Sequence, residues 1–289
     1  MNIFNKEYNH CYYYKVLDGT ITENEIKELN SLVSVAIPKD KDELHEIIEF
    51  YSENYPECSL NWLDVSGITD MSHLFECTRY NGDISEWNTS NVTDMSWMFS
   101  YAKKFNQPIG NWDISSVTDM EHMFESAYEF NQPIGEWDIS NVINMKSMFE
   151  TAFVFNQDIS NWDVSNVTDM SRMFFHVKKF NQSIGNWNVS SVSNMSRMFY
   201  HAEKFNHPIG DWDVSGVIDM SWMFYYAEEF NQNISNWDVS RVTDMHCMFY
   251  NANSFNQDIS RWNVNDKTYI HKIFCNCPIK KEYKPKKLR

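Results

Sequence analysis

The chain has 289 residues, of which 43% are apolar and 16% aromatic, and its formal net charge is −16 at pH 7. This apolar content is sufficient for a large buried core. The strong negative charge disfavours binding to nucleic acid or to anionic membranes, because both repel an acidic surface.

Residues 1–57 carry no repeat and are expected to form an α-rich N-terminal capping region. A strand is predicted at residues 12–16 and a helix at residues 22–32, where Thr22 is the N-cap and Glu25 completes a capping box. A second helix is predicted at residues 40–54. A cap of this kind covers the open core of the first repeat, as repeat proteins require.

The first residues lack the apolar segment of a signal peptide, and no transmembrane stretch or anchor motif is visible. The six cysteines are scattered and suggest reduced thiols rather than a disulfide framework. The sequence by itself therefore favours a cytoplasmic protein without membrane insertion.

Residues 58–279 are predicted to contain about nine repeats of 25 residues. Tryptophan marks this period at Trp62, Trp87, Trp112, Trp137, Trp162, Trp187, Trp212, Trp237 and Trp262. A fixed period of this length is typical of stacked-repeat architectures, in which neighbouring units bury a continuous core.

Each repeat ends in the string Met-x-x-Met-Phe-x-x-Ala. In one copy, Met120, Met123, Phe124 and Ala127 have the spacing of an apolar helical stripe. Asp119 precedes them at the position of a helix cap. The isoleucine three residues before each tryptophan is predicted to lie in a very short strand. A polar loop, which begins at the tryptophan, connects this strand to the short helix. The predicted fold class is an α/β repeat with short parallel strands and short helices.

Three polar columns recur with the same period. An asparagine follows the first phenylalanine of each repeat, from Asn106 to Asn256, and is expected to tie neighbouring turns together through hydrogen bonds. Aspartates follow the tryptophans and precede the methionines. They suit turns and caps, and a ladder of calcium ligands is the alternative.

Residues 280–289 carry +5 of formal charge, so the remaining 279 residues carry −21. This basic C-terminal tail is predicted to be a solvated, disordered end. An anchoring role is the alternative.

The string F-N-Q-x-I-G/S-x-W-D-V-S-x-V-T-D-M-S-x-M-F-x-x-A resembles the BspA-type repeats of bacterial surface proteins, a leucine-rich-repeat-like family. The resemblance covers about residues 58–279. It implies a right-handed, leucine-rich-repeat-like solenoid with an adhesion or protein-binding role, located at the cell surface or secreted. It carries over no catalytic residues.

The variable positions of the Met-x-x-Met-Phe string are the candidates for specific contacts. Aromatic and histidine side chains gather there in the fifth to eighth repeats. The candidate protein-binding residues are Phe175, His176, Tyr200, His201, Trp222, Tyr225, Tyr226 and Tyr250. An exposed aromatic patch marks an interaction site; the alternative is that these rings fill the seam between repeats.

Catalytic motifs are absent from the sequence: there is no Gly-rich phosphate loop, nucleophile elbow or metal-binding histidine pair. The sequence therefore predicts a non-enzymatic solenoid without cofactor or metal that binds another protein, as an adhesin or host-interaction protein. The alternatives are a structural acidic spacer or coat element and a calcium-stabilised solenoid.

Overall fold

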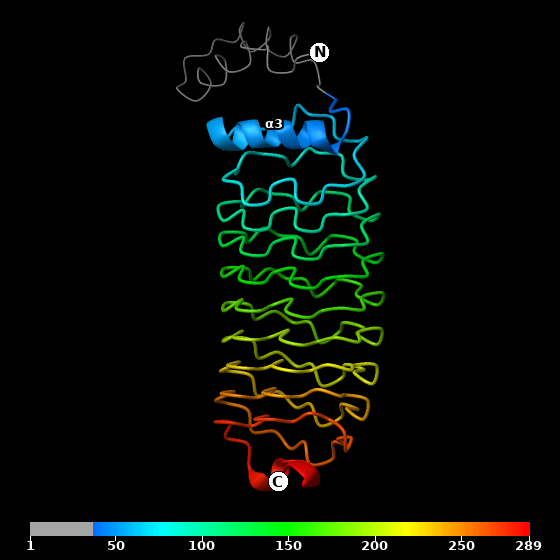
Figure 1. The fold of residues 1–289 in the computed structure, drawn as a ribbon, viewed down its shortest axis with the longest axis vertical. Coiled ribbons are helices and arrows are strands. Elements are labelled where there is room, and N and C mark those ends of the chain that lie inside the picture. The colour runs from blue at the N-terminus through cyan, green and yellow to red at the C-terminus, as the bar shows by residue number, and fades with distance from the viewer. Residues whose placement is uncertain (1–36) are drawn as a thin grey trace, which may run out of the picture.

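The computed structural model describes residues 37–289, which form a stack of similar coils, one for each 25-residue repeat (Figure 1). Helix α3 (Lys41–Asn54) lies across one end of the stack. Two short 3-10 helices, η2 (Lys281–Tyr283) and η3 (Lys286–Leu288), lie at the other. The strand and helix predicted at residues 12–16 and 22–32 lie outside the described residues. Within residues 37–289, no helix is long and apolar enough to cross a bilayer.

Helix α3 confirms the second predicted helix. Asp40 is its N-cap and accepts a hydrogen bond from the Glu43 amide at 3.1 Å, which satisfies one of the free amides of the first turn. One face of the helix packs onto the first coil and joins its core through Leu44, Ile47 and Ile48. Burying side chains of this size stabilises the end of the stack by roughly 1.5–3 kcal/mol each.

Single parallel β-bridges connect each coil to the next, at the residue before the first methionine of the string. The bridged residues are Asp70, Asp94, Asp119, Asn144, Asp169, Asn194, Asp219, Asp244 and Tyr269. The predicted strand at the isoleucine was therefore wrong. Near each isoleucine, hydrogen bonds from side chains connect the coils instead of bonds between strands. The Trp112 indole, for example, donates its N–H to the Ile84 carbonyl of the preceding coil at 3.0 Å.

The predicted short helices were also wrong, because the Met-x-x-Met-Phe-x-x-Ala string forms a series of tight turns. We call this eight-residue string the turn segment and number its positions from 0 at the methionine. Every second amide donates a hydrogen bond within its own coil and so closes a turn: the Met123 amide donates to the Met120 carbonyl at 3.2 Å. The amides between them donate hydrogen bonds to the next coil: the His122 amide donates to the Lys146 carbonyl at 2.9 Å. A helix would direct every amide along its own segment, which would leave the coils unconnected here.

The turn segment requires left-handed backbone at positions 2 and 6 of every coil. In the third coil these residues are His122, with φ 56°, and Ser126, with φ 55°. None of these eighteen positions is a glycine, although the left-handed region costs an ordinary residue about 1–2 kcal/mol. The regular hydrogen bonds between coils offset this cost.

The apolar stripe predicted for the helix nevertheless lies in the core. Met120, Met123, Phe124 and Ala127 are fully buried, and the same positions are buried in the neighbouring coils. Their rings stack along the axis of the molecule: Phe124 lies 5.7 Å from Phe149, with an interplanar angle of 5°. The tryptophans that mark the period are 3–5% exposed from the second repeat to the ninth.

The asparagine column confirms its predicted structural role. The Asn131 amide donates to the Asn106 side-chain oxygen at 2.9 Å, and the Gln132 side chain donates to the Asn106 carbonyl at 2.8 Å. The amide-to-asparagine bond recurs from coil to coil. Each asparagine thereby clamps the coil that follows it.

The aspartates form turns within their own coils. Asp113 accepts hydrogen bonds from the amide and hydroxyl of Ser115 at 3.1 and 2.7 Å, and these bonds lower the pKa of its carboxyl group. Asp119 accepts from the Glu121 amide at 2.8 Å. The turn-forming role is confirmed, whereas the helix-capping role of Asp119 was wrong because no helix follows it.

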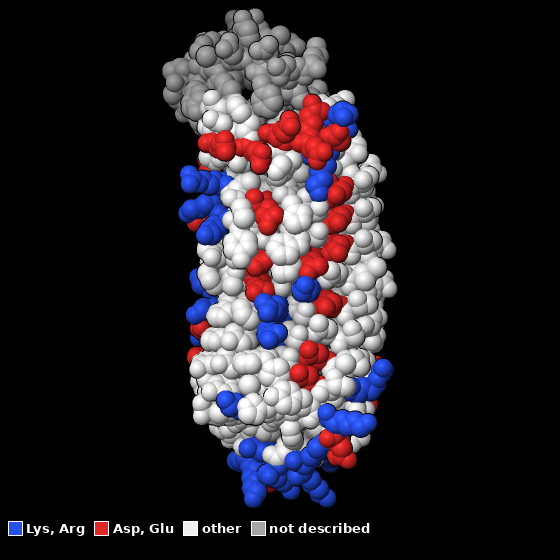
Figure 2. All heavy atoms as spheres, viewed as in Figure 1, with Lys and Arg blue, Asp and Glu red and all other residues white. Residues whose placement is uncertain are grey.

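The basic end of the chain is ordered, contrary to the predicted solvated tail. The Ile259 amide donates to the Tyr283 carbonyl at 3.0 Å, and Tyr283 and Leu288 pack against the core of the last coil. Residues 280–289 therefore cover the open end of the stack. Figure 2 shows Lys and Arg side chains gathered at this end and acidic side chains near α3 at the other.

Candidate interaction face

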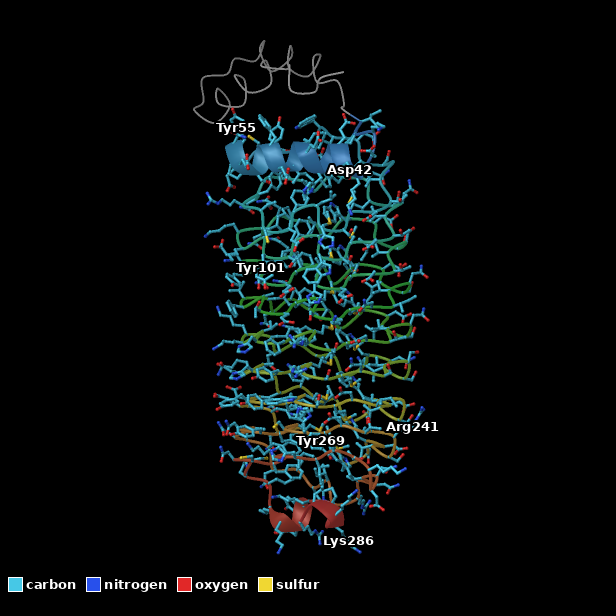
Figure 3. The ribbon with its side chains drawn as sticks, viewed as in Figure 1. Asp42, Tyr55, Tyr101, Arg241, Tyr269 and Lys286 are labelled. Carbon is cyan, nitrogen blue, oxygen red and sulfur yellow. The ribbon has the colours of Figure 1, made fainter. Side chains whose placement is uncertain are left out.

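The outward side chains of the turn segments make one continuous surface along the stack, which we call the turn face. Positions 0, 3, 4 and 7 lie in the core, whereas positions 1, 2, 5 and 6 lie outside the apolar core, and the burial of their side chains differs from coil to coil. Tyr101 at position 6 and Tyr269 before the last turn segment are labelled in Figure 3 and are 41% and 54% exposed. Because the backbone repeats, residues at equal positions in successive coils lie directly above one another.

Position 5 carries a ladder of stacked aromatic rings in the fifth to eighth coils. The ring centroids of Phe175 and Tyr200 are 4.5 Å apart, those of Tyr200 and Tyr225 are 4.6 Å apart, and those of Tyr225 and Tyr250 are 5.0 Å apart. Their interplanar angles are 9°, 8° and 22°. We call these four residues the tyrosine ladder.

Position 6 carries a second ladder beside the first. His176 stacks on His201 and His201 stacks on Tyr226, in both cases with centroids 4.5 Å apart and nearly parallel planes. We call these three residues the histidine ladder. The structure therefore brings together seven of the eight predicted contact residues in two adjoining columns.

Trp222, the eighth, lies at position 2 and leans against Tyr225, with centroids 4.8 Å apart. Its indole N–H donates to His246, whose other ring nitrogen lies 2.7 Å from an Asp244 carboxylate oxygen. The Arg197 guanidinium lies over the Trp222 ring at 5.9 Å. These contacts hold the indole in one orientation at the edge of the ladders.

Both ladders are half-buried, so the two sequence interpretations each describe part of the arrangement. The flat faces of the rings are covered by the rings of adjacent coils, which is the packing role. The exposed part of each half-buried ring is therefore mainly its edge. The turn face therefore offers a rigid row of aromatic edges rather than open ring faces.

Two histidines and two tyrosines of the ladders have pKa values shifted so that their neutral forms are favoured near pH 7. Burial, together with the neighbouring His201, lowers the pKa of His176 to about 4, and burial lowers the pKa of His201. Burial also raises the pKa of Tyr225 to about 12 and raises the pKa of Tyr200. Charged forms are disfavoured because stacking removes part of the water that would solvate them.

The third and fourth coils carry different chemistry at the same positions. Glu125 and Glu150 occupy position 5 and are almost completely buried. His122 at position 2 has its Nδ1 2.6 Å from a Glu125 carboxylate oxygen. We call these three residues the His–Glu cluster. This cluster was not predicted from the sequence, because the histidines occupy no recurring column of the repeat. The signal that would have found it is a His-x-x-Glu pair followed by a second Glu after one full period.

The family comparison agrees with the repeat period. The family model described as "Mycoplasma protein of unknown function, DUF285" matches residues 48–156, 133–225 and 208–281. The chain belongs to this family. No curated protein and no solved structure matches it. The DUF285 matches follow one another along the coils, so the protein is a tandem-repeat protein, and their description assigns it no activity.

Proposed function

We propose that this DUF285 protein is a non-enzymatic scaffold that binds another protein through the tyrosine and histidine ladders. The observation that carries the proposal is the row of half-exposed aromatic edges at Phe175, Tyr200, Tyr225 and Tyr250, which continues over four coils. Tyrosine, tryptophan and arginine are the residue types that dominate the binding energy of protein interfaces.

The rigidity of the ladders favours tight binding. The inner rings Tyr200, Tyr225 and His201 are each clamped between the rings of adjacent coils, so a partner would not have to immobilise them. Ordering a flexible side chain on binding costs about 0.5–1.5 kcal/mol, and here that cost is met during folding. The neutral hydroxyls offer hydrogen bonds without the desolvation penalty of a charge.

The stacked coils and the 25-residue period also fit the proposal that the chain is a solenoid of the BspA type with an adhesion or host-interaction role. Its coils would be built from turns and single bridges in place of the usual strands and helices. Under this proposal the invariant columns stack the coils, and the turn face selects the partner.

The test is a triple Tyr→Phe substitution at Tyr200, Tyr225 and Tyr250. Phenylalanine keeps the ring stacking but removes the surface hydroxyls, so the thermal midpoint should stay close to that of the wild type. Binding partners captured by the immobilised wild-type protein from its source cells would be compared with those captured by the variant. Loss of one specific partner at unchanged thermal stability supports the proposal.

A matched control replaces Asp138, Asp163 and Asp213 by Asn on the exposed loop after the tryptophans, which keeps their turn-forming hydrogen bonds. This control should retain the partner. If the wild type captures no specific partner, the function as a structural spacer gains support. A calcium titration that raises the thermal midpoint would support the calcium-stabilised alternative.

A further inference from the structure

The His–Glu cluster brings three metal-ligating side chains to one point on the turn face. Ligand atoms from His122, Glu125 and Glu150 all lie within 4.8 Å of one another. The side chains of His122 and Glu125 are each 12% exposed, and that of Glu150 is 11% exposed. Two carboxylates this close and this buried repel each other unless positive charge lies between them.

Neighbouring residues hold each ligand in place. The His122 ring stacks on Trp97, with centroids 3.9 Å apart, and its Nε2 lies 3.3 Å from a Glu121 carboxylate oxygen. Glu150 accepts hydrogen bonds from Ser147 at 2.7 Å and from Arg172 at 3.3 Å. A histidine that binds a metal through one ring nitrogen usually directs its other nitrogen at a carboxylate. Glu121 occupies that place for His122 if Nδ1, which lies 2.6 Å from Glu125, is the ligand atom.

A second observation at the same position points to a missing ligand. Ser100 lies at position 5, one coil before Glu125, and is fully buried. Within the described part of the chain, its hydroxyl has no hydrogen-bond partner. An unpaired buried hydroxyl costs about 1–3 kcal/mol, and a water molecule held by a metal ion in the adjacent coil would satisfy it.

We propose that His122, Glu125 and Glu150 bind a divalent transition-metal ion of the Zn²⁺ class. The imidazole nitrogen selects against Ca²⁺ and Mg²⁺, which prefer oxygen ligands only. A tetrahedral ion held at about 2.1 Å from each ligand atom keeps those atoms roughly 3.4 Å apart. His122 Nδ1 and the Glu125 oxygen, which lie 2.6 Å apart, must therefore separate slightly, whereas any pair near the 4.8 Å limit must close in. Water would fill the remaining position of the tetrahedron. This site is separate from the aromatic ladders and does not rest on the function proposed for them.

The competing explanation is a closed ion-pair network in which protonated His122 neutralises Glu125 and Arg172 neutralises Glu150. The chain supplies a matched control for this possibility. His73 and Glu76 form the same pair at positions 2 and 5 of the first coil, with 2.6 Å between Nδ1 and the carboxylate oxygen. The next coil has Ser100 at position 5, so this pair lacks a second carboxylate.

The experiment is calorimetric titration of the full chain with Zn²⁺ and Mn²⁺, with Ca²⁺ for comparison, together with thermal melting. We expect one Zn²⁺ or Mn²⁺ per chain and a raised thermal midpoint. The substitutions His122→Gln, Glu125→Gln and Glu150→Gln should each weaken binding by about tenfold or more. His73→Gln should bind as the wild type does.

The Ser100→Ala variant separates a metal site from an ion-pair network. It should weaken metal binding while leaving the metal-free protein at least as stable as before, because removing an unpaired buried hydroxyl removes its desolvation cost. Absence of binding to the wild type would overturn the proposal. So would binding that survives both Glu→Gln substitutions, which would place the ion elsewhere, for example at the cysteines. Circular dichroism of each variant verifies that it is folded.

Discussion

The two halves of the turn face share one backbone and differ in chemistry. In the third and fourth coils, positions 2 and 5 hold the His–Glu cluster, whereas in the fifth to eighth coils position 5 holds the tyrosine ladder. The φ angles at position 2 hardly change, from 56° at His122 to 60° at Trp222. The core columns and the hydrogen bonds between coils therefore set the backbone, and the outward positions are free to carry charged or aromatic side chains.

The junction between the halves is a single residue. Arg172 donates a hydrogen bond to Glu150 on one side, and its guanidinium lies over the Phe175 ring at 5.4 Å on the other. An arginine suits this place because its planar cation pairs with a carboxylate and also stacks on an aromatic face. Charged and aromatic chemistry can thus adjoin without a break in the stack.

The largest expected effect on stability comes from removing a core phenylalanine, and comparing this effect in the two halves tests whether their cores are equivalent. Phe124 and Phe199 occupy position 4 in different halves, and both are fully buried. We expect Phe124→Ala and Phe199→Ala each to lower the free energy of unfolding by about 3–5 kcal/mol. Denaturation in urea, followed by circular dichroism, measures both. A difference well above 1 kcal/mol between them would show that the core is unequal.

The next prediction moves the chemistry of one half into the other. Tyr225→Glu puts a carboxylate between Tyr200 and Tyr250, where no paired cation replaces the stacking. We expect a loss of about 2–4 kcal/mol at pH 7, with partial recovery at pH 4 as the new carboxyl group takes up a proton. Tyr225→Gln is the uncharged control, and its stability should lack this recovery. Equal pH dependence of the two variants would contradict the explanation.

A smaller effect distinguishes the histidine ladder from the rest of the chain. Because the pKa of His176 is lowered to about 4 and that of His201 is also lowered, the unfolded chain binds more protons than the folded chain below about pH 6.5. The two neutral histidines therefore contribute fully to the free energy of unfolding at pH 7, and this contribution is lost as the pH falls toward 4. Because both side chains are partly exposed, we expect the free energy of unfolding to fall by only about 1–2 kcal/mol between pH 7 and pH 4 from this source.

Denaturation at a series of pH values measures this loss. The double variant His176→Asn and His201→Asn, whose residue type tolerates left-handed backbone, should show a weaker dependence between pH 7 and pH 4. An unchanged dependence would remove the histidine ladder as its source.

The smallest effect concerns the backbone that both halves share. Cys77 and Lys272 lie at left-handed positions in the first and last turn segments, with φ 58° and 55°, and both side chains are exposed. Replacement by glycine removes the conformational strain but adds entropy to the unfolded chain. We expect a net gain of about 0.5 kcal/mol at each site. Replacement by valine should destabilise the protein instead, and thermal melting of the four variants checks the order.

The repeat period, the core columns, the asparagine ladder and helix α3 were predictable, because each depends on a regular pattern of residue types. The helix predicted from Met120, Met123, Phe124 and Ala127 shows where such patterns fail. A series of turns with a period of four residues buries the same positions as a helix with a period of 3.6. Hydrophobic spacing therefore identified the buried face but not the backbone that presents it.

The candidate site was predictable only as a list of residues. Their recurrence at 25 residues places Tyr200 and Tyr225 in one column, but whether their ring faces or edges meet solvent depends on the distance between coils. The His–Glu cluster was missed because His122 and Glu150 lie in different repeats and at different positions of the turn segment. The ordered C-terminal end was missed for a similar reason, since Tyr283 and Leu288 find their apolar partners only on the last coil.

The sequence by itself determined the period, the buried columns and the variable columns, because one spacing repeated along the chain requires each unit to bury the same side chains. Tertiary structure decided the turns, the bridges and the contacts across coils. In the first eight turn segments half of the amides bond to the next coil, so no single repeat can establish its own backbone. The chemistry of the turn face likewise arises only when residues one period apart are stacked within reach of each other.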